Sequence, residues 1–218
     1  SKILDEQRVS ANHGYSKFTL ENYKDWINDQ GQDIPILSHN VFNHYLEPVL
    51  KEKRKLVFII IDCLRLDQWR KISEVLYPIY NIKENFKIAT IPTATPFSRN
   101  AIFSGLLPND LKKEHPDLWK KMFYENQLNN FENILFEKLL KRNGYNNLSH
   151  NYFKISDYSR GDKMANKIND YKNIDILNIV VNFVDILGHS RSESKVLSEL
   201  IPNETAYRDA IFNWFKNS

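Results

Sequence analysis

The sequence predicts an α/β fold, with a mostly parallel sheet and helices on both of its faces. Residues 56–61 (LVFIII) and 175–184 (DILNIVVNFV) are almost entirely apolar and rich in branched side chains, which is typical of strands buried on both faces. Segments with apolar residues at helical spacing flank these two runs. Strands that alternate with helices favour a parallel sheet, with the two apolar runs as central strands.

The residues before the first strand favour helices. Apolar residues recur at helical spacing over residues 18–29 and again over residues 38–50, where Pro48 is expected to kink or end the helix. Residues 1–17 are polar, and we expect them to be flexible. The predicted division is therefore an N-terminal helical segment at 1–54 and the main domain at 55–218.

Further elements are predicted after the first strand. A helix near residues 66–76 follows it, and residues 86–91 (FKIATI) favour another strand. A helix is expected from about Thr95 to Gly105, because Pro96 suits a first helical turn and glycine commonly ends a helix. Other segments with helical patterns are 131–142, 158–170 and 203–215.

Composition excludes some classes of protein. The net charge of +3, from 30 basic and 27 acidic residues, is too small to indicate a nucleic-acid-binding surface. The single cysteine, Cys63, excludes an intrachain disulfide and suits a reducing compartment. No secretory signal is visible, and the longest apolar run is too short to span a membrane. We therefore expect a cytoplasmic protein without a membrane partner.

Each apolar run ends at or near an aspartate. Asp62 follows the first run and Asp185 follows the second. Ligands of parallel sheets bind beyond the carboxyl ends of the strands, so both carboxylates are predicted to lie on the ligand-binding edge. A metal ion would compensate for burying such a charge, but Asp62 alone is equally well explained as a loop residue that caps the next helix.

Thr95 lies at a predicted junction between a strand and a helix. Its hydroxyl is expected to face free N–H groups and the positive end of the helix dipole, which together favour phosphate. A metal ion can activate such a hydroxyl as a nucleophile. Taken alone, Thr95 or Thr93 is more simply explained as a helix cap.

Asp185 and His189 are four residues apart, just after the second run. Carboxylate oxygen and imidazole nitrogen are common zinc ligands, and Gly188 would allow a tight bend that points both at one ion. The alternative is a turn with a solvent-facing histidine.

Three further residues are candidates for contact with substrate: Arg65, Arg99 and Asn100. Arginine suits oxyanions such as phosphate. Structural ion pairs, for example with Asp67, are the alternative for both arginines.

Together these motifs resemble the alkaline-phosphatase superfamily, especially its nucleotide pyrophosphatase/phosphodiesterase branch. Residues 92–108 (PTATPFSRNAIFSGLLP) align without gaps with the segment that carries the nucleophile in that branch. The resemblance to PglZ domains is closer, through residues 62–69 (DCLRLDQW) and 99–105 (RNAIFSG). Three more segments are similar to PorX-like response regulators of type IX secretion: 38–50, 182–185 and 213–218.

The resemblance implies a site with two zinc ions. Thr95 would be the nucleophile and would share one zinc with Asp62, while Asp185 and His189 would bind the other. In the superfamily an Asp-His pair and another histidine complete the two sites from further along the chain. The resemblance implies that the intact domain is an enzyme. These 218 residues contain no Asp-His-Gly motif, so we expect this chain alone to be inactive.

The implied activity is that of a zinc-dependent phosphodiesterase, acting on nucleotides or short oligonucleotides. By the same resemblance it would be the effector domain of a two-component response regulator, with a receiver domain that forms a homodimer and with signalling proteins as partners. Two alternatives remain. One is a non-catalytic module that senses a nucleotide or a protein. The other is the PglZ component of a phage-defence system.

Overall fold

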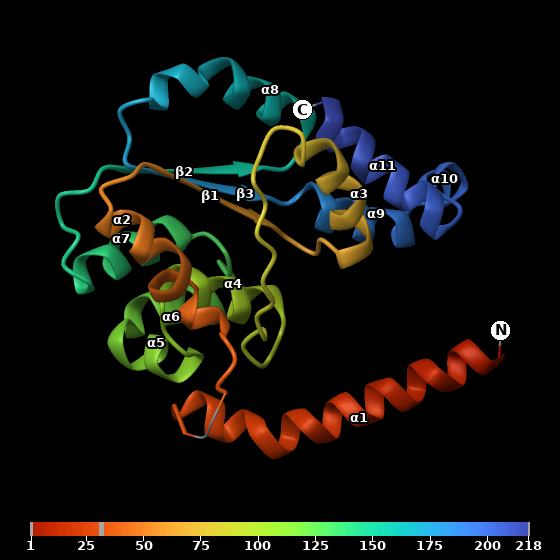
Figure 1. Cartoon of the computed structure of the whole chain (residues 1–218), viewed down its shortest axis with the longest axis horizontal. Helices are drawn as coiled ribbons and strands as arrows, with labels where there is room; N and C mark the ends of the chain where they lie inside the picture. The colour runs from red at the N-terminus through yellow and green to blue at the C-terminus, as the bar shows by residue number, and fades with distance from the viewer. Residues whose placement is uncertain (1, 31–32, 218) are drawn as a thin grey trace.

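The computed structural model, which describes residues 2–30 and 33–217, has a parallel three-stranded sheet between two layers of helices (Figure 1). The predicted fold class, an α/β fold with a parallel sheet and helices on both faces, is confirmed. Among the described residues, no helix is both long enough and apolar enough to cross a membrane.

The strand order is β1 (Leu56–Ile61), β3 (Ile176–Val181), β2 (His150–Ile155). Every residue of β3 is buried, so the second apolar run is the central strand. The prediction that β1 is also central is wrong. β1 forms an edge, and its Val57 and Ile59 side chains are 56% and 53% exposed. An apolar pattern shows that a strand can be buried, whereas its place in the sheet depends on which neighbours pair with it.

Two strand predictions differ from the structure. Residues 86–91 do not form a strand, and their only ladder contact among the described residues is a bridge between Ile88 and Leu37. The sheet instead contains β2, whose sequence HNYFKI was not predicted as a strand. Its apolar residues are interrupted by polar ones, and an edge strand needs no continuous apolar run because its surroundings are only partly buried.

One face of the sheet is covered by α4 (Thr95–Ser104), α5 (Pro108–Glu114), α6 (Pro116–Phe123) and α7 (Glu132–Arg142), with α2 (Glu47–Lys51) at its margin (Figure 1). The core on this face is aromatic, since Phe42, Phe103 and Phe136 pack edge to face. Gly105 ends α4 in the left-handed conformation, with φ of 64°, as the glycine signal predicts.

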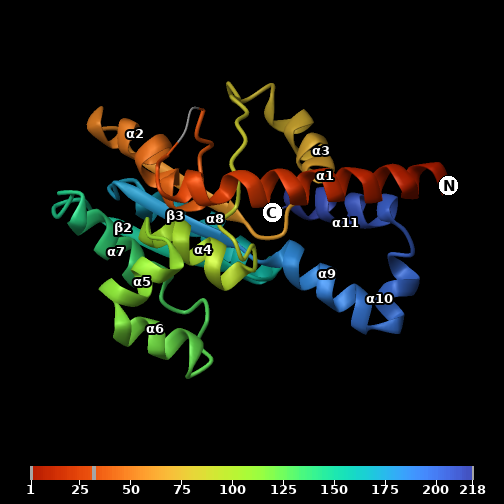
Figure 2. The same cartoon turned by 90° about the horizontal axis from the view of Figure 1, so that it is seen from below.

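The other face carries α8 (Tyr158–Lys167) and a short 3-10 helix (Ile168–Tyr171), together with α3 (Leu66–Leu76) and α11 (Glu204–Asn217). α9 (Phe183–Glu193) and α10 (Lys195–Leu200) extend from the carboxyl end of β3 toward α11 (Figure 2). Trp214 of α11 packs with Ile179 and Met164 in the core on this side. The helices predicted near 66–76, 131–142, 158–170 and 203–215 are confirmed.

The N-terminal segment is one helix, α1 (Lys2–Ile27), most of which is exposed beside the domain (Figure 1). The expectation of a flexible stretch at 1–17 is wrong for the described residues 2–17. Ion pairs one turn apart, such as Lys2 with Glu6, support the helix over this stretch.

The second N-terminal helical segment is packed into the main domain. It has a π-helical turn at Phe42–Leu46 just before Pro48, which is where a proline disturbs helical hydrogen bonding. Its Phe42, Leu46 and Leu50 side chains lie in the main core. The domain division after residue 54 stays a prediction.

Candidate functional site

The three strands end in register, so the residues after them share one edge of the sheet. Ile61, Val181 and Ile155 are aligned at this edge. Asp62 follows β1 and is held there by its backbone N–H, which donates to the Val181 carbonyl at 3.0 Å. Asp185 lies in the first turn of α9, directly after β3. The structure therefore places both aspartates on the edge where parallel sheets bind ligands.

Arg99 of α4 connects the strand ends. Its Nη1 donates to Asp62 Oδ2 at 2.7 Å and to Asn182 Oδ1 at 2.9 Å. Its Nε donates to Glu132 Oε1 at 2.5 Å, and the Tyr152 hydroxyl donates to the other Glu132 oxygen. Arg99 is therefore the centre of a polar cluster that draws residues from α4, α7 and β2 and from the ends of β1 and β3.

The charges of this cluster are buried. Arg99 is 3% exposed and Glu132 is 1% exposed. Burial opposes the charge on Arg99, but the hydrogen bond and the charge of Glu132 outweigh it, and the pKa of the guanidinium is raised. Burial beside Glu132 raises the pKa of Tyr152, so its phenol stays a hydrogen-bond donor. The Asp62 carboxylate is thus fixed by a permanently charged partner.

A second group of contacts surrounds Asp185. The Cys63 thiol donates to Asp185 Oδ1 at 3.0 Å, and His189 Nε2 lies 3.5 Å from the same oxygen. Burial, followed by the hydrogen bond to Asp185, raises the pKa of Cys63 to about 12, so the thiol stays protonated near neutral pH. Because Cys63 is adjacent to Asp62 in the chain, this contact links the two aspartates.

Asp185 and His189 approach each other through a helix, contrary to the predicted bend at Gly188. Both lie in α9, one turn apart, and the His189 side chain is 74% exposed. Gly188 serves close packing instead: a Cβ atom built there would lie 3.0 Å from the hydroxyl of Tyr207. That hydroxyl donates to the Val184 carbonyl, which fixes α9 against α11.

Thr95 is the first residue of α4, and Ala94 occupies the capping position without a side-chain cap. Within the described residues, neither the Thr95 nor the Thr93 hydroxyl has a hydrogen-bond partner, so the alternative that one of them caps the helix finds no support in these contacts. Thr95 lies one turn before Arg99, on the same side of the helix.

The predicted cluster of free N–H groups at Thr95 is smaller than expected. Pro96 has no N–H, and the Phe97 N–H donates to the Ala94 carbonyl at 3.0 Å. The start of α4 therefore offers fewer backbone donors to an anion than the sequence predicted.

The other two substrate candidates have structural partners. Arg65 pairs with Asp67 and Glu204, which fits the alternative of a structural ion pair. Asn100 is fully buried and donates to the carbonyls of Pro96 and Leu128 at 2.7 and 3.0 Å. Of the three, only Arg99 reaches Asp62.

The donor atoms at this edge have the chemistry of a divalent metal site, but they are few. Asp185 and His189 supply a carboxylate and an imidazole from one helical turn, while Asp62 lies beside Arg99. In the described part of the chain, no three His, Cys, Asp or Glu side chains are grouped closely enough to hold a metal ion. Catalytic zinc typically has three protein ligands, so these residues fit part of a metal site.

Four contributors to the site were not predicted, namely Asn182, Glu132, Tyr152 and Cys63. Asn182 had a usable signal, because it follows the second apolar run just as Asp62 follows the first. Glu132 had none, since a single acidic residue at a helix start is ordinary in sequence.

The sheet, the helices on both faces and the acidic strand ends define an alkaline-phosphatase-like domain. A family model described as the BREX system PglZ alkaline phosphatase-like domain matches residues 41–214, and the chain belongs to this PglZ family. No curated protein matches the chain significantly.

Proposed function

We propose that the carboxyl edge of the sheet hydrolyses phosphodiesters, with Thr95 as the nucleophile. The observation that carries the proposal is the Arg99 side chain, which lies one turn from Thr95 and holds Asp62 at the edge. The hydroxyl of Thr95 has no competing partner among the described residues. Membership of an alkaline-phosphatase-like family supports a phosphohydrolase reaction.

In the proposed reaction the Thr95 oxygen attacks phosphorus in line. A bond forms between this oxygen and phosphorus while the bond to the leaving alcohol breaks, and the leaving oxygen takes a proton. Water then cleaves the phosphothreonine, which returns the hydroxyl and releases a phosphomonoester. Arg99 Nη2 is buried without a hydrogen-bond partner in the described residues, so the surrounding contacts leave one donor group of the guanidinium unused.

The proposed cofactor is a pair of zinc ions. Asp62 and Thr95 would hold one ion, and Asp185 and His189 would hold the other. Bound zinc would lower the pKa of a coordinated hydroxyl and stabilise charge on the leaving oxygen. The donor types support this assignment.

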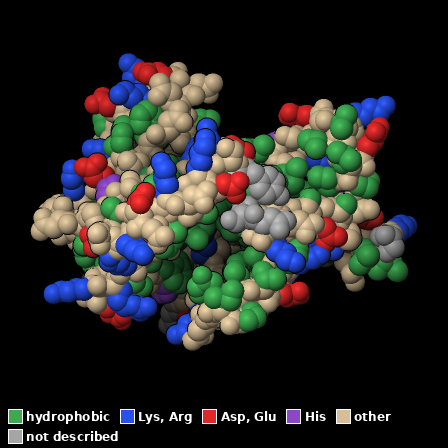
Figure 3. All heavy atoms as spheres, turned by 90° about the horizontal axis from the view of Figure 1, so that it is seen from above, with side chains coloured by type: hydrophobic (Ala, Val, Ile, Leu, Met, Phe, Trp, Pro, Cys, Tyr) green, Lys and Arg blue, Asp and Glu red, His purple; other side chains and the backbone are tan. Residues whose placement is uncertain are grey.

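The proposed substrates are nucleotides or short oligonucleotides. The net charge of +3 supports a small substrate rather than a long nucleic acid. Figure 3 shows one face of the molecule, where Lys and Arg side chains lie scattered among acidic and hydrophobic ones rather than in one basic field.

The proposed biological role is that of an effector domain in a PorX-like response regulator, with a dimerising receiver domain and signalling partners. Similarity over residues 38–50, 182–185 and 213–218 supports this role. The description of the matching family supports a second candidate, the PglZ component of a phage-defence system. A receiver domain encoded in frame with this chain would favour the first role. Genes for phage defence beside it would favour the second.

Replacing Thr95 with alanine tests the proposed reaction, with Thr93→Ala as the matched control. Both variants would be assayed for hydrolysis of a chromogenic phosphodiester, with zinc content determined in each. The assay uses a longer natural chain that contains these residues, since hydrolysis is expected of the intact domain. We expect Thr95→Ala to lose hydrolysis and Thr93→Ala to retain most of it. Each should stay folded, because a polar residue at a helix start contributes only about 1 kcal/mol.

Other outcomes would change the proposal. Loss of activity in Thr93→Ala alone would move the nucleophile by two residues. If both variants stay active with zinc bound, attack by Thr95 is wrong.

A further inference from the structure

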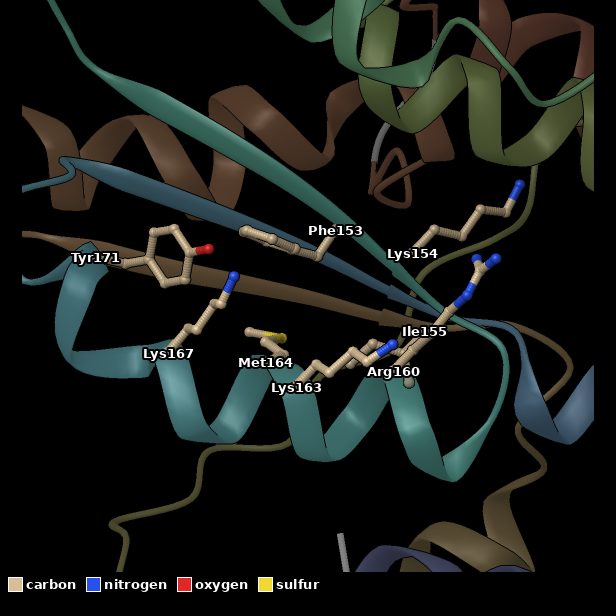
Figure 4. Close-up of a pocket in the computed structure, with 8 residues that line it drawn as sticks. All are labelled: Phe153, Lys154, Ile155, Arg160, Lys163, Met164, Lys167 and Tyr171. Carbon is tan, nitrogen blue, oxygen red and sulfur yellow. The ribbon is translucent and has the colours of Figure 1, made fainter.

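A cavity of about 250 Å³ lies between β2 and α8 (Figure 4). Neither Thr95 nor Asp62 is among the residues that line it. Its floor is apolar and partly aromatic, formed by Phe153 and Ile155 of β2, Met164 of α8, and Tyr171. The rings of Phe153 and Tyr171 meet edge to face at 4.9 Å between their centroids. This volume is somewhat below the range of about 300–1,000 Å³ that is usual for drug-sized ligands, so it suits a single ring system.

The rim of this cavity is cationic. Arg160, Lys163 and Lys167 lie along one side of α8, and Figure 4 shows their side chains around the floor. Arg160 has a carboxylate nearby, since its Nε is 3.5 Å from Asp157. Within residues 2–30 and 33–217, neither Lys163 nor Lys167 has a carboxylate within 4.0 Å. An apolar, partly aromatic floor beside two ammonium groups that have no carboxylate within 4.0 Å matches a ligand that combines a ring with an anion.

The cavity reaches the candidate catalytic edge. Ile155, one of its walls, is the last residue of β2 and accepts a hydrogen bond at 2.8 Å from the N–H of Asn182. The side chain of Asn182 in turn accepts from Arg99.

One charged residue of the cavity, Lys154, also interacts with the candidate catalytic edge. It lines the same cavity, and Figure 4 shows its ammonium group directed away from α8. Its charge interacts with those of Glu132, Arg99 and Asp62 on one side and with that of Arg160 on the other. The charge of Lys154 therefore interacts with residues of both the candidate site and the cavity rim.

We propose that this cavity is a subsite for the nucleoside part of a nucleotide substrate, with the base on the Phe153, Met164 and Tyr171 floor and a phosphate near Lys163 and Lys167. Aromatic side chains bind bases of any sequence, and lysines act as point charges toward phosphate. The subsite rests on the proposed phosphodiesterase function, for which it defines the substrate class.

Calorimetric titration of the 218-residue chain in EDTA tests the subsite without relying on catalysis. The probes are adenosine 5′-monophosphate, ribose 5-phosphate and adenosine. We expect the nucleotide to bind at least about tenfold more tightly than either part, because only the nucleotide uses both floor and rim.

Two double variants locate the binding. Lys163→Ala with Lys167→Ala should weaken nucleotide binding at least about tenfold. The control is Lys120→Ala with Lys121→Ala, two exposed lysines of α6 on the opposite face of the sheet, and it should bind as the unmodified chain does. Circular dichroism confirms that each variant is folded.

Three results would overturn the subsite: no nucleotide binding by the unmodified chain, equal binding of ribose 5-phosphate and the nucleotide, or unchanged binding in the Lys163/Lys167 variant. Thr95→Ala separates this outcome from the proposed function. If that variant loses hydrolysis while the Lys163/Lys167 variant binds normally, the function stands and the subsite is wrong. If the binding results are as expected but hydrolysis does not depend on Thr95, the subsite stands and the proposed function of Thr95 is wrong.

Discussion

The Arg99 side chain shows how one residue can organise an edge of the sheet. Its guanidinium is almost fully buried and contacts two carboxylates and an amide oxygen. Removing a charge from water is costly, and only close partners offset that cost. Arg99 therefore requires Glu132 behind it in order to present Asp62 at the edge.

We expect Glu132→Gln to destabilise the chain by roughly 3 kcal/mol, because it leaves Arg99 with one buried carboxylate fewer. The matched control is Glu137→Gln on the same helix, which breaks an exposed pair with Lys141 and should cost no more than about 0.5 kcal/mol. Urea denaturation of both variants provides the comparison. Equal effects would show that the buried pair contributes no more than a surface pair.

Helix α4 is the element that positions the site, because it carries both Thr95 and Arg99. Its C-terminal end is closely packed: a Cβ atom on Gly105 would lie 2.7 Å from Cδ1 of Leu139 in α7. Leu139 is itself buried in the core, so it has little room to move. The packing of α4 against α7 thus fixes where Thr95 and Arg99 lie.

Gly105→Ala is expected to destabilise the chain by about 2–3 kcal/mol, through left-handed strain and overpacking together. Gly144→Ala isolates the strain, because Gly144 also has a positive φ, of 83°, but has open space around it. It should cost only about 1 kcal/mol. Thermal unfolding of the two variants measures the difference. Similar losses of stability would show that the contact with Leu139 relaxes freely.

At the scale of the whole molecule, several histidines are only partly accessible to water. Burial lowers the pKa of His39, His115 and His150. Each has a buried ring nitrogen without a hydrogen-bond partner among the described residues. The folded chain therefore resists protonation at these positions, whereas the unfolded chain does not.

This difference predicts that stability falls as the pH drops from 7 to 5. The folded pKa of each histidine is below its unfolded value of about 6.5, so the unfolded state binds more protons below that pH. The contribution of these histidines to the free energy of unfolding is fully present above about pH 6.5 and is lost below it. It amounts to a total on the order of 1 kcal/mol after solvent screening. Denaturant midpoints at pH 5, 6 and 7 measure the slope. A variant with asparagine at all three positions should flatten it, and an unchanged slope would contradict the assignment.

Several elements and site residues could be predicted because their signals are local in the sequence. Two continuous apolar runs were sufficient to predict β1 and β3, and their acidic ends placed Asp62 and Asp185 on the ligand edge. Pro96 and Gly105 marked the start and end of α4. These signals work because burial of a whole strand and the termini of a helix depend on residues close together in the chain.

The strand order and the residues that complete the site could not be predicted, because both depend on contacts between remote parts of the chain. Arg99 contacts Glu132 and Asn182, which are 33 and 83 residues away, and no local pattern encodes such pairs. Likewise, Gly188 lies inside α9 and packs against Tyr207 of α11, a contact that the residues around Gly188 do not encode. Strand order, charge partners and helix packing depend on contacts that form when remote parts of the chain exclude water together, so they cannot be predicted from spacing along the sequence.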